Sequence, residues 1–262
     1  MSRNWVIYSD IDGTLVDERY CYEKALPAIN LVKKKKIPLV FCTSKTRVEI
    51  EVYREKLEIN DPFISENGGA VFIPEGYFGD VKFDKIDGYE VIELGTPYRK
   101  LRDVLNRIEK SVDCKITGFG DMTAEDIANV SGLDPESAAL AKQREYDEPF
   151  IIRYGDEREI IEQIKSHGLN YTRGGRFHHI LGDNDKGKAV RILTRLFREN
   201  GFRGKTIALG DGKNDIQMLR EVDTPILIKR TDGTYIDFED DAIKTKLVGP
   251  EGWNDEILKL IS

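Results

Sequence analysis

The sequence is poor in cysteine and has no long apolar run. Its cysteines, Cys21, Cys42 and Cys114, are odd in number and lack paired ligand spacing, so neither a disulfide framework nor a zinc site is predicted. No segment approaches the roughly 20 apolar residues of a membrane helix, and the first residues lack the apolar stretch of a secretion signal. We therefore expect a reduced, soluble, cytoplasmic protein with no membrane partner.

An excess of positive charge is also missing. The chain carries 40 Lys and Arg residues against 47 Asp and Glu residues, which gives a formal net charge of −7. Because nucleic-acid-binding proteins are usually basic, we expect no nucleic-acid partner. With 262 residues, 40% of them hydrophobic, the chain suits one large domain or two modest ones with an ample core. Nothing in the composition predicts an oligomeric state.

The two ends of the chain alternate apolar strands with helices, whereas the middle does not. Near the N-terminus we expect strands at 5–9, 38–42, 62–64 and 70–73 and a helix at 47–57. Near the C-terminus we expect helices at 186–198, 216–222 and 255–260, a strand at 206–209 and a loop at 248–253. This pattern predicts an α/β fold with a mostly parallel sheet.

The middle of the chain predicts an α+β insert in that sheet domain. Strands are expected at 90–94, 150–153, 169–172 and 177–181, with helices at 101–108 and 157–166 and two short helices opened by Thr123 and by Asp134-Pro135. The predicted division is a first core segment at 1–86, an inserted domain at 87–182 and a second core segment at 183–262.

Four polar clusters fall at the ends of predicted strands or at a helix start. They are Asp10-Ile11-Asp12-Gly13-Thr14, Thr43-Ser44-Lys45-Thr46, Asn184-Asp185-Lys186-Gly187 and Gly210-Asp211-Gly212-Lys213-Asn214-Asp215. Open parallel sheets bind ligands outside the carboxyl ends of their strands, so we expect these clusters to meet in space.

The pair Asp10 and Asp12 carries the strongest single signal. Alternation along an extended chain sends both carboxylates the same way. Two carboxylates this close repel each other unless a cation lies between them or one holds a proton. Taken alone, each cluster has a structural explanation, since Asp-Gly makes turns, Thr43-Ser44 suits a helix cap and Lys186 suits a surface. Their joint occurrence favours a functional site.

The four clusters resemble motifs one to four of the haloacid dehalogenase superfamily of phosphatases. The resemblance implies a Rossmann-like parallel-sheet core with an inserted cap of the C2 type. It implies that Asp10 is the nucleophile, that Asp12 is the acid and base, and that Thr43 and Lys186 hold the phosphate. It also implies a Mg²⁺ site formed by Asp10, the backbone carbonyl of Asp12 and Asp211, with Asp215 as a ligand or a neighbour of the ligands. Oxygen donors of this kind suit Mg²⁺, and a carboxylate nucleophile divides one difficult displacement into two easier ones.

Segments near the predicted cap carry a closer resemblance. Thr43-Ser44-Lys45-Thr46-Arg47, Pro62-Phe63-Ile64-Ser65-Glu66-Asn67-Gly68, Arg144-Glu145-Tyr146-Asp147-Glu148 and Gly175-Arg176-Phe177 resemble the mannosyl-3-phosphoglycerate phosphatases. This resemblance implies removal of phosphate from a small phosphorylated glycoside, giving the compatible solute mannosylglycerate, with Mg²⁺ as cofactor.

Several residues are predicted to bind that substrate. They are Ser44, Lys45, Asn67, Gly68, Gly69, Arg176 and Asn214. The Arg176 guanidinium suits the glycerate carboxylate, and Asn67 and the acidic run at 145–148 suit hexose hydroxyls. One of the adjacent residues His178 and His179 must face away from a site on that strand, so neither receives a role.

Three other functions are left open by the sequence. Glucosyl-3-phosphoglycerate differs from the mannosyl compound only in hydroxyl stereochemistry. A phosphohexomutase of related architecture would return the phosphoryl group to a sugar. A non-catalytic sugar-phosphate binding protein would not need Asp10, Asp12 and Lys186, and the presence of all three argues against that alternative.

Overall fold

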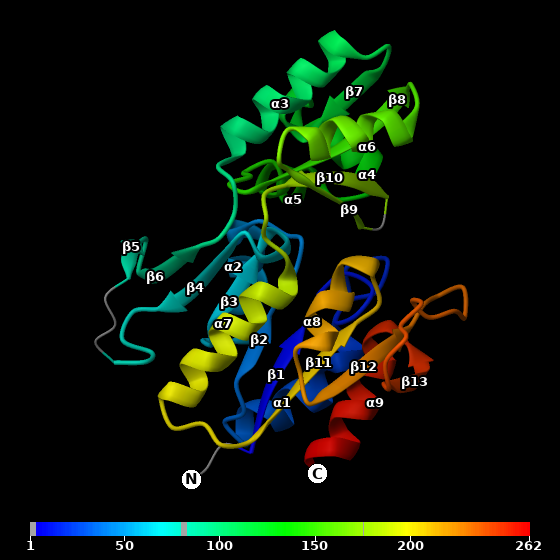
Figure 1. Cartoon of the computed structure of the whole chain (residues 1–262). Helices are drawn as coiled ribbons and strands as arrows, with labels where there is room; N and C mark the ends of the chain where they lie inside the picture. The colour runs from blue at the N-terminus through cyan, green and yellow to red at the C-terminus, as the bar shows by residue number, and fades with distance from the viewer. Residues whose placement is uncertain (1–3, 80–82, 175) are drawn as a thin grey trace.

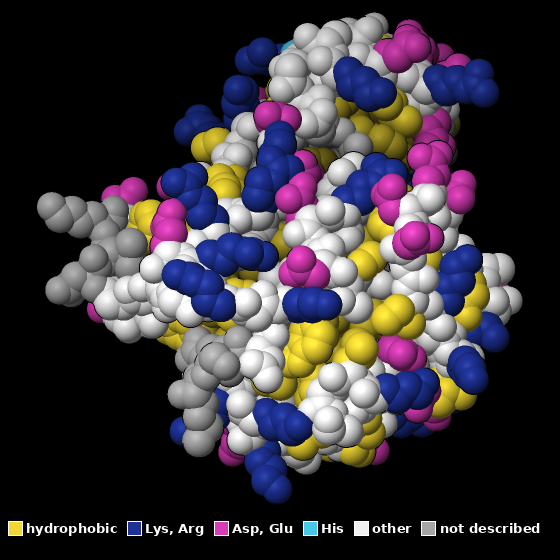
Figure 2. Space-filling model, turned by 60° about the horizontal axis from the view of Figure 1, so that its bottom comes forward, with side chains coloured by type: hydrophobic (Ala, Val, Ile, Leu, Met, Phe, Trp, Pro, Cys, Tyr) yellow, Lys and Arg dark blue, Asp and Glu magenta, His cyan; other side chains and the backbone are white. Residues whose placement is uncertain are grey.

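The computed structural model describes residues 4–79, 83–174 and 176–262, and it has two lobes (Figure 1). The core (residues 4–79, 83–94 and 183–262) contains a parallel sheet. The cap (residues 95–174 and 176–182) contains an antiparallel sheet and lies beyond one end of the parallel strands. On the face shown in Figure 2, acidic and basic side chains are interspersed. The α/β class with an inserted cap, predicted from the sequence, is confirmed.

The parallel sheet has five strands in the order β13-β12-β11-β1-β2. They are β1 (Trp5–Ser9), β2 (Leu39–Phe41), β11 (Lys205–Gly210), β12 (Thr224–Lys229) and β13 (Ile243–Val248). Helices cover both faces: α1 (Leu26–Lys34), α2 (Arg47–Leu57), α7 (Lys186–Glu199), α8 (Ile216–Arg220) and α9 (Gly249–Ile261). In β1 the side chain of Ile7 packs on one face and those of Val6 and Tyr8 on the other. Burial on both faces explains the continuous apolar run of this strand.

A second, antiparallel sheet of the core has the order β3-β4-β6-β5. Its strands are β3 (Phe63–Ser65), β4 (Ala70–Pro74), β5 (Asp84–Ile86) and β6 (Tyr89–Glu93). The predicted boundary at 86/87 assigned β6 to the insert. The structure pairs β6 with β4 from Ala70 opposite Glu93 to Pro74 opposite Tyr89, and Ile92 packs in the core. We therefore place the start of the cap after Leu94.

The cap sheet has the order β7-β8-β10-β9. Its elements are α3 (Tyr98–Ser111), β7 (Lys115–Gly118), α4 (Ala124–Ser131), α5 (Pro135–Ala141), β8 (Asp147–Tyr154), α6 (Glu157–Ser166), β9 (Asn170–Gly174) and β10 (Phe177–Leu181). The predicted helix starts are present: the Thr123 side chain accepts the N–H of Asp126, and that of Asp134 accepts the N–H of Ser137. Gly175, part of the turn before β10 in the sequence prediction, lies outside the described residues.

The C-terminal segment corrects one prediction. The expected loop at 248–253 is the first part of α9, which begins at Gly249. Pro250 lies in the first turn, where a helix needs no N–H donor. Trp253 is fully buried, and its indole Nε1–H donates to Ser9 Oγ at 2.9 Å, which ties α9 to the end of β1. Within the ranges that the structure describes, no helix is both long and apolar enough to cross a bilayer.

Candidate active site

The sheet register brings the predicted clusters together. Ser9, the last residue of β1, lies opposite Phe41 of β2 and Leu209 of β11. The residues that follow these strands therefore emerge at one edge of the sheet. Lys186 is the first residue of α7, and the N-cap Asp185 accepts the N–H of Lys188 at 2.8 Å. The helix start thereby points the lysine at the strand ends.

Three carboxylates, two of them buried, meet there around one lysine. Oxygen atoms of Asp10, Asp211 and Asp215 lie within 4.8 Å of one another. The Lys186 ammonium donates to Asp10 Oδ1 at 2.7 Å and to Asp215 Oδ1 at 2.6 Å, and this lysine is 1% exposed. Burial alone would lower the pKa of Lys186, but Asp10 and Asp215 raise it above its ordinary value. The lysine is therefore charged and offsets part of the negative charge.

The remaining negative charge makes this cluster suited to a divalent cation. Burial, followed by the Asp215 charge, raises the pKa of Asp10 well above its usual range. The same two causes raise the pKa of Asp211 to about 7. These carboxylates therefore lack sufficient positive charge around them, which a bound cation would supply. A donor set made of oxygens alone fits Mg²⁺.

Asp215 also holds the loop that carries Asp211. Its Oδ2 accepts the backbone N–H groups of Asp211 at 3.0 Å and Gly212 at 2.8 Å. Arg230 fixes the other side of the loop, because its Nε and Nη2 donate to the Asp211 carbonyl at 2.9 and 2.6 Å. The Thr14 hydroxyl donates to Asp211 Oδ1 at 3.1 Å. Asp211 is thus oriented by three neighbours.

Asp12 has surroundings unlike those of Asp10. Its side chain is 43% exposed and forms an ion pair with Lys45, Oδ1 to Nζ 3.0 Å. Lys45 is buried, lies 3.6 Å from Glu49 Oε1, and has its ammonium 5.1 Å from the centre of the Tyr20 ring. The two aspartates therefore differ in their surroundings: Asp10 is held in the carboxylate cluster, whereas Asp12 is partly open to the cavity.

The segment after β2 supplies the predicted phosphate-binding groups. Thr43 is fully buried, and its hydroxyl oxygen accepts the N–H of Lys45 at 3.3 Å. Ser44 and Lys45 line the cavity, and α2 begins directly after them with Thr46 as its N-cap. Arg144 of the cap donates to the Ser44 carbonyl at 2.9 Å and holds the segment in place. Backbone amides at such a helix start favour an anion.

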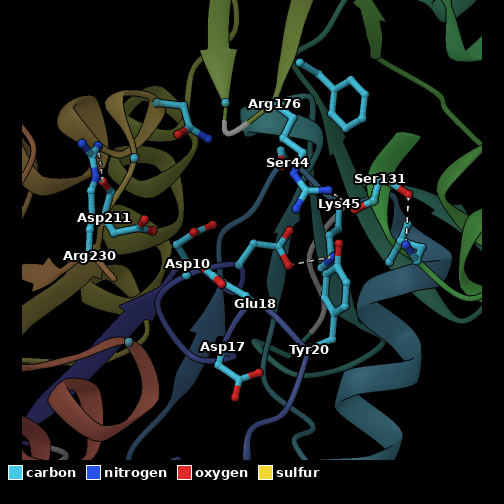
Figure 3. Close-up of a pocket in the computed structure, with 18 of the residues that line it drawn as sticks. Asp10, Asp17, Glu18, Tyr20, Ser44, Lys45, Ser131, Arg176, Asp211 and Arg230 are labelled. Carbon is cyan, nitrogen blue, oxygen red and sulfur yellow. Dashed lines mark hydrogen bonds and ion pairs between the residues drawn. The ribbon is translucent and has the colours of Figure 1, made fainter. Parts of the chain in front are cut away.

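A cavity of about 700 Å³ lies between these motifs and the cap. Asp10, Asp12 and Asp211 line it from the core, and Arg176 reaches into it from the turn between β9 and β10 (Figure 3). An Arg176 Nη1–H donates to the Ser131 carbonyl at 2.9 Å, so the guanidinium is oriented. Apolar cap residues complete the wall: Phe119, Leu133, Ala141, Pro149 and Phe177.

The predicted substrate-binding residues Asn67, Gly68 and Gly69 are not brought to this cavity wall. Asn67 is 2% exposed; its Nδ2 donates to Asp147 Oδ2 at 2.6 Å, and its Oδ1 accepts from Asn214 Nδ2 at 2.9 Å. Gly68 has φ +86°, and a Cβ there would lie 2.2 Å from the Asp185 carbonyl oxygen. This turn packs core against cap. Asn214, another of the predicted substrate-binding residues, does line the cavity.

The acidic run is also placed differently from the prediction. Asp147 and Glu148 lie fully buried in β8 instead of facing a sugar. Glu148 Oε1 accepts from Arg102 Nη1 at 2.7 Å, and its Oε2 accepts from the Tyr98 hydroxyl at 2.8 Å. Glu66 of the core accepts the N–H groups of 145–147 at 2.8–2.9 Å. The run therefore joins the two lobes.

Several cavity residues were given no role by the sequence analysis. They are Tyr20, Phe119, Phe177, His179 and Arg230. Each comes from a segment whose apolar or charged residues are as typical of ordinary packing as of a binding site. The alternation on β10 could have shown that Phe177 and His179 share one face, but which face meets the cavity depends on the tertiary structure.

Comparison with known proteins gives matches over most of the chain. A family model described as haloacid dehalogenase-like hydrolase matches residues 7–117 and 119–238. A Methanococcoides burtonii protein named glucosyl-3-phosphoglycerate/mannosyl-3-phosphoglycerate phosphatase is 50% identical over 98% of this chain and 97% of its own length. The mannosyl-3-phosphoglycerate phosphatase of Pyrococcus horikoshii is 39% identical over 85% of this chain and 90% of its own.

A solved structure from Thermoplasma acidophilum shares the fold. It superposes with a TM-score of 0.70 at 18% identity and covers 100% of this chain and 99% of its own. Identity at that level supports the two-lobe architecture alone.

Proposed function

The chain belongs to the haloacid dehalogenase-like hydrolases, and on that basis we propose that it hydrolyses mannosyl-3-phosphoglycerate, and also its glucosyl counterpart, to the glycosylglycerate and phosphate. The observation that carries this proposal is the cluster of Asp10, Lys186 and Asp211 at the base of a cavity that Arg176 enters from the cap. One relative is named for both substrates and another for the mannosyl compound, and these names support the choice.

Asp10 and Asp12 divide the chemistry between them. A carboxylate oxygen of Asp10 attacks phosphorus, and the bond from phosphorus to the glycerate oxygen breaks. Asp12 gives its proton to that oxygen, which leaves as a hydroxyl group. Asp12 then takes a proton from a water molecule as the water oxygen attacks phosphorus, and the Asp10 carboxylate is released with inorganic phosphate. Lys186 holds Asp10 in position and offsets the negative charge of the phosphate.

Mg²⁺ is the proposed cofactor. Asp10, Asp211 and the backbone carbonyl of Asp12 would hold it, with Asp215 orienting Asp211. When bound, the ion supplies positive charge to the phosphate oxygens. The Thr43 hydroxyl and the backbone amide of Ser44 would bind a further phosphate oxygen.

The cap wall suits the organic part of the substrate. The Arg176 guanidinium offers paired N–H donors to the glycerate carboxylate. Phe119 and Phe177 provide an apolar wall for a sugar ring beside polar groups, a combination usual for small-molecule sites.

Cys21, Cys42 and Cys114 are free thiols, which supports a reducing compartment and hence the proposed cytoplasmic location.

The test is phosphate release with Mg²⁺ and with EDTA. Mannosyl-3-phosphoglycerate, glucosyl-3-phosphoglycerate, 3-phosphoglycerate and mannose 6-phosphate are assayed in parallel. We expect Mg²⁺-dependent turnover with a higher kcat/KM for the two glycosyl compounds. Turnover of mannose 6-phosphate alone would refute the substrate and retain the chemistry. Transfer of the phosphoryl group between sugar positions would instead identify a mutase.

A further inference from the structure

His179 lies in the cavity wall with one ring nitrogen engaged and the other open. The residue is in the middle of β10 and is 4% exposed. Its Nδ1 lies 2.9 and 3.0 Å from the two carboxylate oxygens of the fully buried Asp147. No hydrogen bond to Nε2 is formed within the part of the chain that the structure describes. The contact with Asp147 therefore fixes the orientation of the imidazole, and Nε2 faces the cavity.

Asp147 determines which nitrogen carries a proton. Although burial alone would raise the pKa of Asp147, His179, Arg144 and Asn67 hold it below its ordinary value. The ionised carboxylate can only accept, so Nδ1–H of His179 donates to it. Nε2 is then an acceptor in neutral imidazole and a donor in the protonated ring. A hydroxyl group both donates and accepts, and is the partner that satisfies either form.

The open edge of His179 lies near the loop that carries Asp211. A Cβ at Gly174 would lie 3.4 Å from His179 Nε2 and 3.8 Å from Asn214 Nδ2. Gly174, having no side chain, leaves this edge uncovered. Phe177, two residues earlier on β10, shares the same face and also lines the cavity. A sugar ring on that wall would bring its hydroxyls within reach of the imidazole.

We propose that His179 is a specificity-determining residue that hydrogen-bonds a hexose hydroxyl of the substrate through Nε2. The proposal rests on the proposed function, since it requires a substrate with a hexosyl group. His179 takes no part in the reaction at phosphorus, and Asp12 still carries out the proton transfers. Asp147 is the positioning residue behind the imidazole.

Two substitutions separate this role from a structural one. In His179→Gln the amide reaches the position of Nε2, whereas in His179→Asn it reaches only the position of Nδ1 and retains the bond to Asp147. His178→Gln is the matched control, because His178 faces the other side of β10, where its Nδ1 lies 2.9 Å from the Tyr171 hydroxyl and its ring stacks on Phe150.

Steady-state kinetics on mannosyl-3-phosphoglycerate and 3-phosphoglycerate distinguish a hexose-binding role of His179 from a structural role. We expect His179→Asn to raise KM for the mannosyl compound about tenfold or more, and His179→Gln to stay within about threefold of the unsubstituted protein. KM for 3-phosphoglycerate, which lacks the hexose, stays nearly constant in both. The His178→Gln control leaves both KM values unchanged.

Other outcomes overturn the proposal. Equal losses for His179→Asn and His179→Gln, or a better result for Asn, would show a structural role through Asp147. A KM increase of the same size on 3-phosphoglycerate would show contact with the phosphate or the carboxylate. If the unsubstituted protein used mannose 6-phosphate and neither glycosyl compound, the proposed function would fail; the same variants on mannose 6-phosphate would still test whether His179 reads a hexose hydroxyl.

Discussion

Replacing Lys186 by methionine tests whether this lysine neutralises the carboxylates of Asp10 and Asp215. The side chain keeps its approximate length and loses the ammonium that lies 2.7 Å from Asp10 and 2.6 Å from Asp215. Removing one partner of a buried ion pair leaves an uncompensated buried charge, at a cost of about 3–5 kcal/mol. At about 2–4 °C per kcal/mol for a chain of this size, the melting temperature in EDTA should fall by on the order of 10 °C.

Mg²⁺ should restore part of that stability. Without the lysine the cluster of Asp10, Asp211 and Asp215 is more negative, so a divalent cation gains more from binding there. A ligand at 100 times its Kd stabilises a protein by about 2.7 kcal/mol. We therefore expect the Mg²⁺-induced rise in melting temperature to be larger for Lys186→Met than for the unsubstituted protein. Turnover should still fall about 100-fold or more, because the nucleophile has lost its positioning charge.

Lys188→Met is the matched control for this experiment. Lys188 lies in the same first turn of α7, but its side chain is 40% exposed and pairs with Asp183 at 2.8 Å on the surface. Such a pair contributes about 0–1 kcal/mol. Differential scanning fluorimetry in EDTA and in Mg²⁺, together with phosphate release, compares the two variants. Equal melting temperatures for Lys186→Met and Lys188→Met would refute the inference that Lys186 neutralises the cluster.

Three further results are expected. Asp10→Asn should abolish phosphate release while the melting temperature in EDTA stays the same or rises, because a buried carboxylate with a raised pKa is replaced by a neutral amide; appreciable residual turnover would contradict its role as nucleophile. Arg176→Ala should raise KM for glycosyl phosphoglycerates about tenfold and spare p-nitrophenyl phosphate, with Arg176→Lys intermediate; equal losses on both substrates would argue against carboxylate binding. Gly68→Ala should be far more destabilising than Gly76→Ala and should lower turnover, since both glycines have positive φ but only a Cβ at Gly68 would lie 2.2 Å from the carbonyl oxygen of Asp185. Gly76→Ala should cost about 1 kcal/mol. Similar melting temperatures for the two variants would show that the packing of Gly68 against Asp185 does not matter.

Local patterns in the sequence determined the architecture and predicted which polar clusters meet in space. The apolar run before Asp10 predicted a strand, and β1 forms there with both faces buried. The sequences opened by Thr123 and Asp134 predicted helix starts, and both caps form. The convergence of Asp10 and Asp211 followed from one rule, that parallel strands end at the same edge of a sheet, and Lys186 joins them from the start of α7. These predictions succeeded because the information lies within a few residues of chain or in strand direction.

The tertiary structure alone decided which polar residues of the cap and its junction face the cavity. Asn67 and Asp147 are as polar as any binding residue, yet each is enclosed by partners more than 30 positions away in the chain. His178 and His179 are neighbours of the same type, and the packing of Phe150 on one side of β10 assigns His178 to the interior and leaves His179 at the cavity. Alternation along a strand separates two faces, but only the packing of one lobe against the other determines which face meets the ligand.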